Sequence, residues 1–296
     1  MIKTFLMSAF TLFAPIYISA STLKSEIAEK IQAIPLKDRE RVEKLFRGLL
    51  FFHEFAYTLF GDKPVSVDWF DREQEQTTEL QELFRIRPDG YRAWEKYAHL
   101  FPSKNYLFLF CEDVKADCYE LTLINKEAFR QIVDKHREKF AELFGPDFDP
   151  EKLLNLLVQK GSLWNTPMRG RADLTGILLG YGKTNAELFQ KRNEILRKEG
   201  IKKGRTQPSQ QFDSIDAELN FLDASLKSFS NEGKVSLHFM RLPGFVANPQ
   251  HEETIQLRQK YTQQRKYITQ RYIRRNVLEI TLEQLMAESN QNREIK

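Results

Sequence analysis

Apolar residues recur along most of the chain at intervals of three and four positions, the spacing that lines one face of an α-helix. Four shorter segments alternate apolar and polar residues or carry a dense apolar run, as strands do. Helices are predicted over 25–33, 36–60, 73–84, 90–100, 126–144, 150–160, 174–179, 185–198, 215–229 and 251–286, the last as one long helix or a broken pair. Strands are predicted near 65–69, 105–111, 118–123 and 235–241. This pattern predicts an α+β fold, a mainly helical single domain with a small antiparallel sheet.

The predicted helix over 36–60 becomes apolar on nearly all sides in its second half, which indicates that this part is buried. Glu54 lies in that half. A carboxyl group in apolar surroundings has its pKa raised by desolvation, and that property suits a general acid near neutral pH. Asp68 follows on the next strand, and a pair of carboxylates is what a lysozyme-like glycosidase needs. The alternative is that Glu54 points to the polar edge of the helix or satisfies a buried partner.

The clearest β-hairpin joins the strands over 105–111 and 118–123 through a polar connector. Cys111 and Cys118 are equidistant from the centre of that connector, so this register places them opposite each other. An exported protein with two cysteines in such a position is expected to form a disulfide. The geometric demands on a direct cross-strand disulfide leave two separate thiols as the alternative.

A glycine turn, Gly180-Tyr181-Gly182, is expected to join two short helices, because glycine adopts positive φ at no steric cost. Thr184 with Glu187 is typical of a capping box at the start of the second helix. The sequence from Gly182 to Thr184 also resembles the end of a phosphate-binding P-loop. The spacing fails, however, because Ile177 stands where that loop requires glycine.

Basic residues flank this turn. Arg169 and Arg171 lie beside a flexible glycine and next to a predicted helix start, a corner suited to a carboxylate or a phosphate. Together with Tyr181 and Lys183 they form a candidate ligand-binding face. The alternative is that both arginines pair with surface acids.

A second basic segment lies in the last predicted helix, where no acid occurs between Glu253 and Glu279. Such a helix suits contact with an anionic ligand, a cell-wall polymer or a membrane surface, and a solvated face is the alternative. The residues proposed for that contact are Arg265, Lys266, Arg271, Arg274 and Arg275.

The first twenty residues have the anatomy of a signal peptide: Lys3, an apolar run over 5–18, and small residues from Ser19 to Ser21. We therefore expect an exported protein, periplasmic or secreted, with an uncleaved membrane anchor as the alternative. The expected organisation is a signal peptide over 1–20, the domain over 21–288 and a frayed tail over 289–296. A subdomain boundary is predicted at 199–213, which is polar and rich in glycine and lysine.

The segment GILLGYGKTNAELF, residues 176–189, resembles part of a group of uncharacterised exported proteins of chlamydia-like intracellular bacteria. The resemblance extends to the region between the two cysteines. It implies an exported bacterial protein and no known activity.

Composition and the absence of certain motifs further limit the classes of function that the sequence predicts. The 296 residues are 41% hydrophobic and 29% charged with a net charge of +4, a balance that carries no specific signal for nucleic acid. No second histidine follows His53 at the spacing of a zinc protease, and we expect neither a cofactor nor a metal. The sequence thus predicts a non-catalytic exported binding protein, with a cell-wall glycosidase that uses Glu54 as general acid as the alternative.

Overall fold

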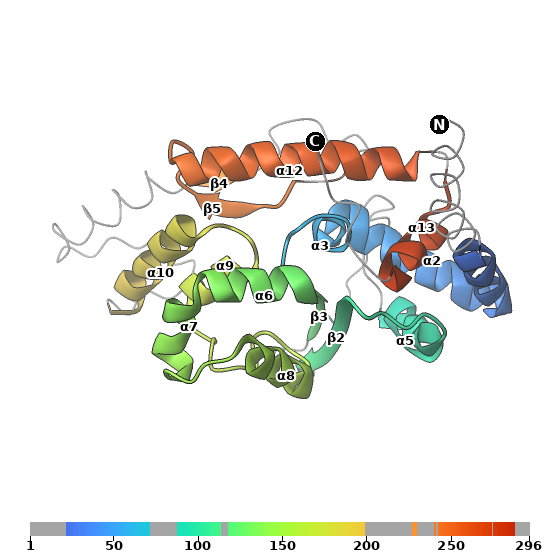
Figure 1. The fold of residues 1–296 in the computed structure, drawn as a ribbon, viewed down its shortest axis with the longest axis horizontal. Coiled ribbons are helices and arrows are strands. Elements are labelled where there is room, and N and C mark those ends of the chain that lie inside the picture. Colours follow the sequence, from blue (N-terminus) through green and yellow to red (C-terminus); the bar gives the residue numbers. More distant parts are fainter. Residues whose placement is uncertain are drawn as a thin grey trace, which may run out of the picture.

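The fold is that of a computed structural model, shown in Figure 1, which describes residues 22–71, 88–113, 118–198, 227–229, 240, 242–273 and 275–287. Its helices are 22–33, α2 (Leu36–Phe52), α3 (Phe55–Leu59), α5 (Pro88–Tyr97), the short 3-10 helix η1 (Ala98–Leu100), α6 (Lys126–Lys135), α7 (Arg137–Phe144), α8 (Pro150–Lys160), α9 (Ala172–Leu178), α10 (Lys183–Lys198), α12 (Glu252–Tyr272) and α13 (Val277–Met286). Its strands are β1 (Val65–Asp71), β2 (Tyr106–Asp113), β3 (Cys118–Asn125), β4 (Lys227–Phe229) and β5 (Phe245–Ala247). The prediction of a mainly helical α+β domain with a small antiparallel sheet is confirmed.

The main sheet has the order β1-β3-β2, with both neighbours antiparallel to the central strand β3. Successive side chains of a strand point to opposite faces, so each face of this sheet is covered separately. Tyr119, Leu121 and Leu123 of β3 belong to one hydrophobic core, whereas Ile124 belongs to a second. The central strand is therefore buried on both sides, and its polar residues Glu120 and Thr122 are buried as well.

The two cores draw on different parts of the chain. The first combines α2, α3 and α5 with α12 and α13, so the beginning and the end of the described chain pack together. The second combines α6, α7, α8 and α9 with the other face of the sheet. Figure 1 shows this division: the green and yellow helices α6 to α10 lie on one side of β2 and β3, and the blue and red helices gather on the other.

Helix α12 lies across both groups in Figure 1 and is buried along one stripe. Tyr261, Ile268 and Tyr272 on this stripe are spaced by seven and four residues, as on one helical face. Among the described residues, no helix combines the length and the apolar character needed to cross a membrane. The outer face of α12 carries the basic residues discussed below.

Three predicted long helices are each divided in two. The helix predicted over 36–60 ends at Phe52 and restarts at Phe55, because Glu54 adopts a left-handed conformation with φ of 46°. The helix predicted over 126–144 is interrupted at His136, and the last helix is a broken pair, one of the two forms expected. In each case the two halves pack into the same hydrophobic core, so helical periodicity continues across a break that it does not reveal.

The remaining strand and helix predictions have mixed outcomes. The first three predicted strands form the main sheet, whereas the strand predicted over 235–241 lies outside the described residues except for Met240. The helices predicted over 73–84 and over most of 215–229 also lie outside them. The helix predicted over 215–229 is wrong at residues 227–229, which form β4 and pair with β5 in a separate two-stranded sheet.

The predicted disulfide is wrong. Cys111 and Cys118 are not bonded to each other, and both are half-buried. The hairpin register places Cys111 opposite Glu120 and Cys118 opposite Asp113, two residues away from the predicted register. The cysteines are therefore diagonal neighbours on one face, and diagonal pairs lie too far apart for a disulfide without movement of the backbone.

Candidate functional site

The turn between α9 and α10 depends on glycine at two positions. Gly180 and Gly182 have φ of 73° and 89°, values that other residues rarely adopt. A Cβ atom on Gly180 would lie 2.6 Å from the Tyr261 hydroxyl oxygen, and one on Gly182 would lie 2.5 Å from Cδ of Glu253. The turn is thus pressed closely against α12, and this contact brings the start of α10 beside the start of α12.

Glu253 caps helix α10 from a distance of 70 residues in the sequence. Its carboxylate accepts hydrogen bonds from the backbone N–H groups of Lys183 at 2.8 Å and Thr184 at 2.9 Å. These donors have no partner within a helix, and the helix dipole favours a negative charge there. Lys183 is already the first helical residue, so the predicted capping box of Thr184 and Glu187 is not formed. The position that resembles a phosphate-binding loop is filled by the protein's own carboxylate.

Asn185 fixes the same junction from the other side. Its side chain is buried, accepts a hydrogen bond from the Thr254 hydroxyl at 3.0 Å and donates one to the Tyr181 carbonyl at 3.0 Å. The starts of α10 and α12 therefore hold each other in a fixed orientation. Such mutual support suits the wall of a binding cleft. The wall is already ordered in the free protein, so ligand binding does not have to supply the free energy of ordering it.

A cleft of about 750 Å³ opens beside this junction, between α6, the α9–α10 turn and α12. This volume is typical of sites for small organic ligands. The cleft is lined by apolar, basic and acidic side chains together. The residues that line it are Asp62, Pro64, Ala128, Gln131, Ile132, Lys135, His136, Ile177, Gly180, Gly182, Lys183, His251, Glu252, Glu253, Gln256, Leu257 and Lys260.

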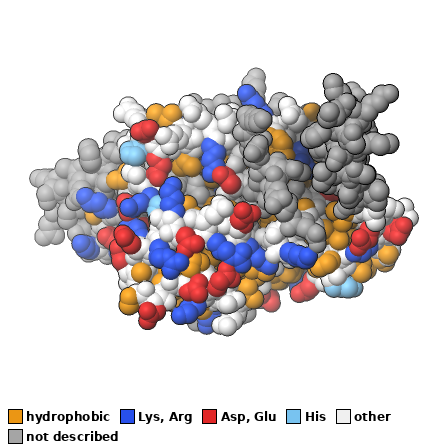
Figure 2. All heavy atoms as spheres, viewed as in Figure 1, with side chains coloured by type: hydrophobic (Ala, Val, Ile, Leu, Met, Phe, Trp, Pro, Cys, Tyr) orange, Lys and Arg blue, Asp and Glu red, His pale blue; other side chains and the backbone are white. Residues whose placement is uncertain are grey.

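The charges of the cleft are unevenly matched. Of its three acids, Glu253 is engaged with α10, Asp62 pairs with Lys260 at 2.9 Å, and Glu252 accepts a hydrogen bond from the Gln256 side chain at 2.9 Å. Lys135 and Lys183 are exposed, and the part of the chain that the structure describes contains no ion pair for either. Figure 2 shows lysine and arginine side chains gathered on the left, where α6 and α10 approach each other in the same view, with acidic side chains among them.

His136 interacts electrostatically with both of these lysines. The half-buried imidazole ends α6, and burial is the main cause that lowers its pKa; the charges of Lys135 and Lys183 lower it further. Glu253 and Glu187 act in the opposite direction. An imidazole that senses both lysines shows that the three basic groups share one electrostatic environment. We refer to Lys135, His136 and Lys183 as the cleft cations.

Glu54 lies outside the cleft lining, in a cluster of buried polar groups. One carboxylate oxygen accepts a hydrogen bond from the Gly244 N–H at 2.6 Å, and the other lies 3.3 Å from the Lys63 ammonium. The Tyr181 hydroxyl also donates to this carboxylate, and burial followed by the charge of Glu54 raises the pKa of Tyr181. Both oxygens of Glu54 therefore have partners within the protein, which matches the expected alternative of a satisfied buried group.

Lys63 is the least expected member of that cluster, because its side chain is only 1% exposed. Burial lowers its pKa, and the neighbouring Glu54 opposes that shift. The ammonium also donates a hydrogen bond to the Val65 carbonyl at 2.6 Å. A buried charge of this kind is costly unless it is paired, so Glu54 and Lys63 depend on each other.

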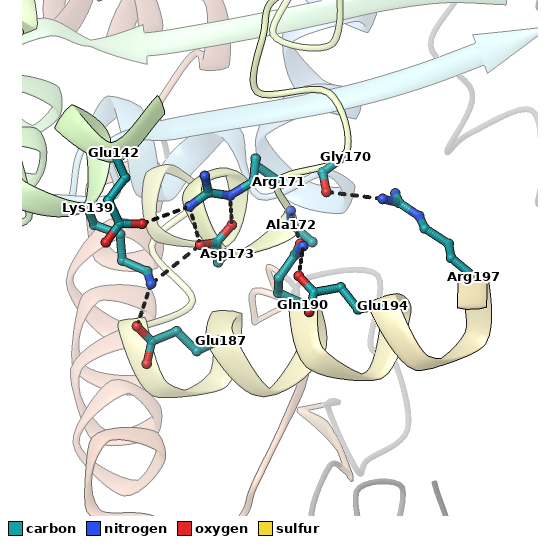
Figure 3. Close-up of polar contacts among 10 residues, drawn as sticks. All are labelled: Lys139, Glu142, Gly170, Arg171, Ala172, Asp173, Glu187, Gln190, Glu194 and Arg197. Carbon is teal, nitrogen blue, oxygen red and sulfur yellow. Dashed lines mark hydrogen bonds and ion pairs between the residues drawn. The ribbon is translucent and has the colours of Figure 1, made fainter. Parts of the chain in front are cut away.

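The two candidate arginines differ. Arg171 donates two hydrogen bonds to Asp173, each at 2.9 Å, and reaches Glu142 at 3.5 Å, as Figure 3 shows. Lys139 lies 3.5 Å from Asp173 and 2.9 Å from Glu187. We call these five residues the Arg171 cluster; every member has an opposite charge beside it. Arg171 thus pairs with acids of the protein, which was the alternative to ligand binding.

Arg169 is exposed and belongs neither to the Arg171 cluster nor to the cleft lining. The four candidates near the turn therefore do not form one site. Tyr181 contacts Glu54 and Lys183 lines the cleft, whereas Arg169 and Arg171 lie elsewhere.

The basic residues of the C-terminal segment are partly engaged by the protein itself. Arg271 donates a hydrogen bond to the Tyr267 hydroxyl at 2.8 Å, and Arg275 makes two contacts with Glu283 at 2.9 and 3.0 Å. Lys266 is exposed and Arg265 is half-buried, while Arg274 lies outside the described residues. The ion pair with Glu283 offsets the charge of Arg275, which follows α12, whereas the hydrogen bond to the neutral Tyr267 hydroxyl leaves the charge of Arg271 in place.

Sequence reasoning missed the residues that matter most. It attached no role to Lys135, His136, Lys63 or Glu253. Glu253 acts on Lys183, 70 positions earlier in the sequence, and no local motif marks any of the four residues. Among the described residues, no group of three or more histidine, cysteine, aspartate or glutamate side chains is arranged to hold a metal ion.

Searches of protein-family models, curated proteins and solved structures found no match to this chain. The resemblance of residues 176–189 to exported proteins of chlamydia-like bacteria stays a prediction. The geometry of the cleft is therefore what supports a function.

Proposed function

We propose that this protein is a non-catalytic binding protein that holds a small ligand in the cleft between α6, α10 and α12. The observation that supports this proposal is a cleft of about 750 Å³ whose walls are fixed by the junction of Glu253 with α10. A cleft with fixed walls and a mixture of apolar and charged side chains suits recognition of a small molecule. Export, expected from the first twenty residues, is part of the proposal.

The polar cluster around Glu54 favours binding over glycoside hydrolysis. A general acid must offer its proton to a substrate, and both carboxylate oxygens of Glu54 have partners within the protein. Asp68, the carboxylate expected to act with it, contacts the His53 imidazole through its carboxylate. These contacts give both acids a role in stability.

The proposal is tested by obstructing the cleft. Gln256 lines the cleft and is exposed, so Gln256→Trp fills space there without disturbing the core. Gln263→Trp is the matched control, because Gln263 is exposed on the same helix two turns away and does not line the cleft. The probe is 8-anilinonaphthalene-1-sulfonate, whose fluorescence rises when it leaves water.

We expect saturable binding of one probe molecule to the wild type and to Gln263→Trp, and loss of that binding in Gln256→Trp. Equal binding by all three proteins would mean that the probe does not use the cleft, and the proposed function would be abandoned. Circular dichroism of the three proteins controls for unfolding.

A further inference from the structure

One face of α6 offers the cleft two kinds of contact. Ile132 lines the cleft, and Lys135 and His136 follow three and four positions later, which places all three on the same side of the helix. Ile177 and Leu257 add apolar surface from α9 and from α12. The cleft thus combines an apolar wall with a basic edge.

The basic edge is not neutralised from within. Lys183 approaches from the start of α10 and influences His136, although the two residues are 47 positions apart in the sequence. On α12, Glu253 already accepts hydrogen bonds from three N–H groups of α10, and Glu252 accepts one from the Gln256 side chain. The Arg171 cluster shows the contrast, since its cations have carboxylates within 2.9 Å to 3.5 Å.

We infer that the ligand of this cleft is an organic anion, bound through its charged group by Lys135, His136 and Lys183. Its apolar part packs against Ile132 and Leu257. The inference rests on the proposed function and adds the chemical class of the ligand. A carboxylate, a phosphate or a sulfonate satisfies it equally, because all accept hydrogen bonds from ammonium and imidazolium groups.

The inference also gives the cleft a dependence on pH. An anion beside His136 favours the protonated imidazole, so binding takes up a proton and strengthens as the pH falls through the range in which histidine titrates. Of the groups nearest the imidazole, Lys135 and Lys183 oppose its protonation, and Glu187 and Glu253 favour it. The other charged or titratable groups that line the cleft are Asp62, His251, Glu252 and Lys260.

The test compares two probes that differ in charge. 8-Anilinonaphthalene-1-sulfonate carries a sulfonate, and N-phenyl-1-naphthylamine has the same ring system without it. We expect the anionic probe to bind the wild type roughly tenfold more tightly, the factor that two partly exposed ion pairs supply. The double variant Lys135→Gln/Lys183→Gln should lose that advantage and bind the neutral probe as the wild type does.

A second double variant, Lys37→Gln/Lys160→Gln, removes the same charge at exposed positions outside the cleft lining and should keep the advantage. Between about pH 7.5 and about pH 5.5 the advantage should grow in the wild type and stay constant in His136→Gln. Equal affinity of the wild type for both probes, or an equal loss in both double variants, would overturn the inference. If Gln256→Trp still abolished probe binding in that case, the proposed function would stand and only the inferred class of ligand would be wrong.

Discussion

Two groups of charged residues lie beside helix α10, and they differ in how their charges are matched. In the Arg171 cluster, arginine, lysine and three acids pair with one another around the buried Asp173. Among the cleft cations, Lys135 and Lys183 line a cleft, and Glu253 in the same lining is engaged with the N–H groups of α10. Basic residues near a glycine turn therefore do not identify a site; the positions of the acids around them decide whether a charge is left for a ligand.

The Glu54–Lys63 pair is the most buried example of matched charge, and breaking it should have the largest effect. Lys63→Met leaves the carboxylate without its cation, and we expect it to lower the free energy of unfolding by about 3 kcal/mol. Urea denaturation followed by circular dichroism measures the change. Lys30→Met is the control, because Lys30 pairs with Glu26 on a helix surface, and it should cost less than about 0.5 kcal/mol. Similar losses in the two variants would show that burial does not set the value of the pair.

The junction that fixes the cleft wall is tested by Gly182→Ala. The new Cβ meets the Glu253 carboxylate, and a non-glycine residue at positive φ is strained, so we expect a loss of about 2 kcal/mol. Gly145→Ala is the matched control: its φ is 94°, but a Cβ there has no atom within 4 Å. Thermal unfolding of both variants separates the strain from the collision. If Gly145→Ala cost as much as Gly182→Ala, the contact with Glu253 would contribute nothing.

The Arg171 cluster should be worth less, because its cations are partly exposed. Arg171→Gln is expected to lower the free energy of unfolding by about 1.5 kcal/mol at neutral pH, whereas Arg169→Gln at an exposed position should change it by less than about 0.5 kcal/mol. Burial raises the pKa of Asp173, but hydrogen bonds from Arg171 and the Leu174 N–H, with the charges of Arg171 and Lys139, outweigh it and lower the pKa.

A lowered carboxyl pKa stabilises the fold above the unfolded value, and this contribution disappears as the pH falls through the folded value. The difference between Arg171→Gln and the wild type should therefore shrink below about pH 4, near the ordinary pKa of aspartate. A difference that is constant from neutral to acidic pH would contradict the role given to Asp173.

Glu54→Gln separates the two functions suggested by the sequence. It keeps the shape of the side chain but leaves the buried Lys63 ammonium without its counter-ion, so we expect a loss in the free energy of unfolding similar to that of Lys63→Met, about 3 kcal/mol. Neither the wild type nor the variant should release fragments from purified peptidoglycan. Turnover by the wild type that Glu54→Gln abolishes would favour the glycosidase and remove the proposal of a non-catalytic protein.

Local patterns predicted much of the fold. Strands β1, β2 and β3 follow from their apolar runs, and α8 follows from its periodicity together with the capping residue Asp149. The glycine turn was also predictable, because Gly180 and Gly182 both adopt positive φ. These features depend on residues within a few positions of each other, and sequence reasoning handles such features well.

The parts that were not predicted depend on distant contacts. The hairpin register differs by two residues from the one expected from the cysteines, since β2 extends to Asp113 and pairs that residue with Cys118. Glu253 caps a helix 70 positions earlier, and Lys63 is buried by residues that the chain reaches only later. No pattern around these residues shows which partner the fold will bring to them.

The central claim is that an organic anion binds among the cleft cations. The most direct test is a crystal structure of the protein with 8-anilinonaphthalene-1-sulfonate bound. The account predicts the sulfonate within hydrogen-bonding distance of Lys135, His136 and Lys183, with the rings against Ile132. A probe bound at another surface, with the cleft between α6, α10 and α12 left empty, would contradict it.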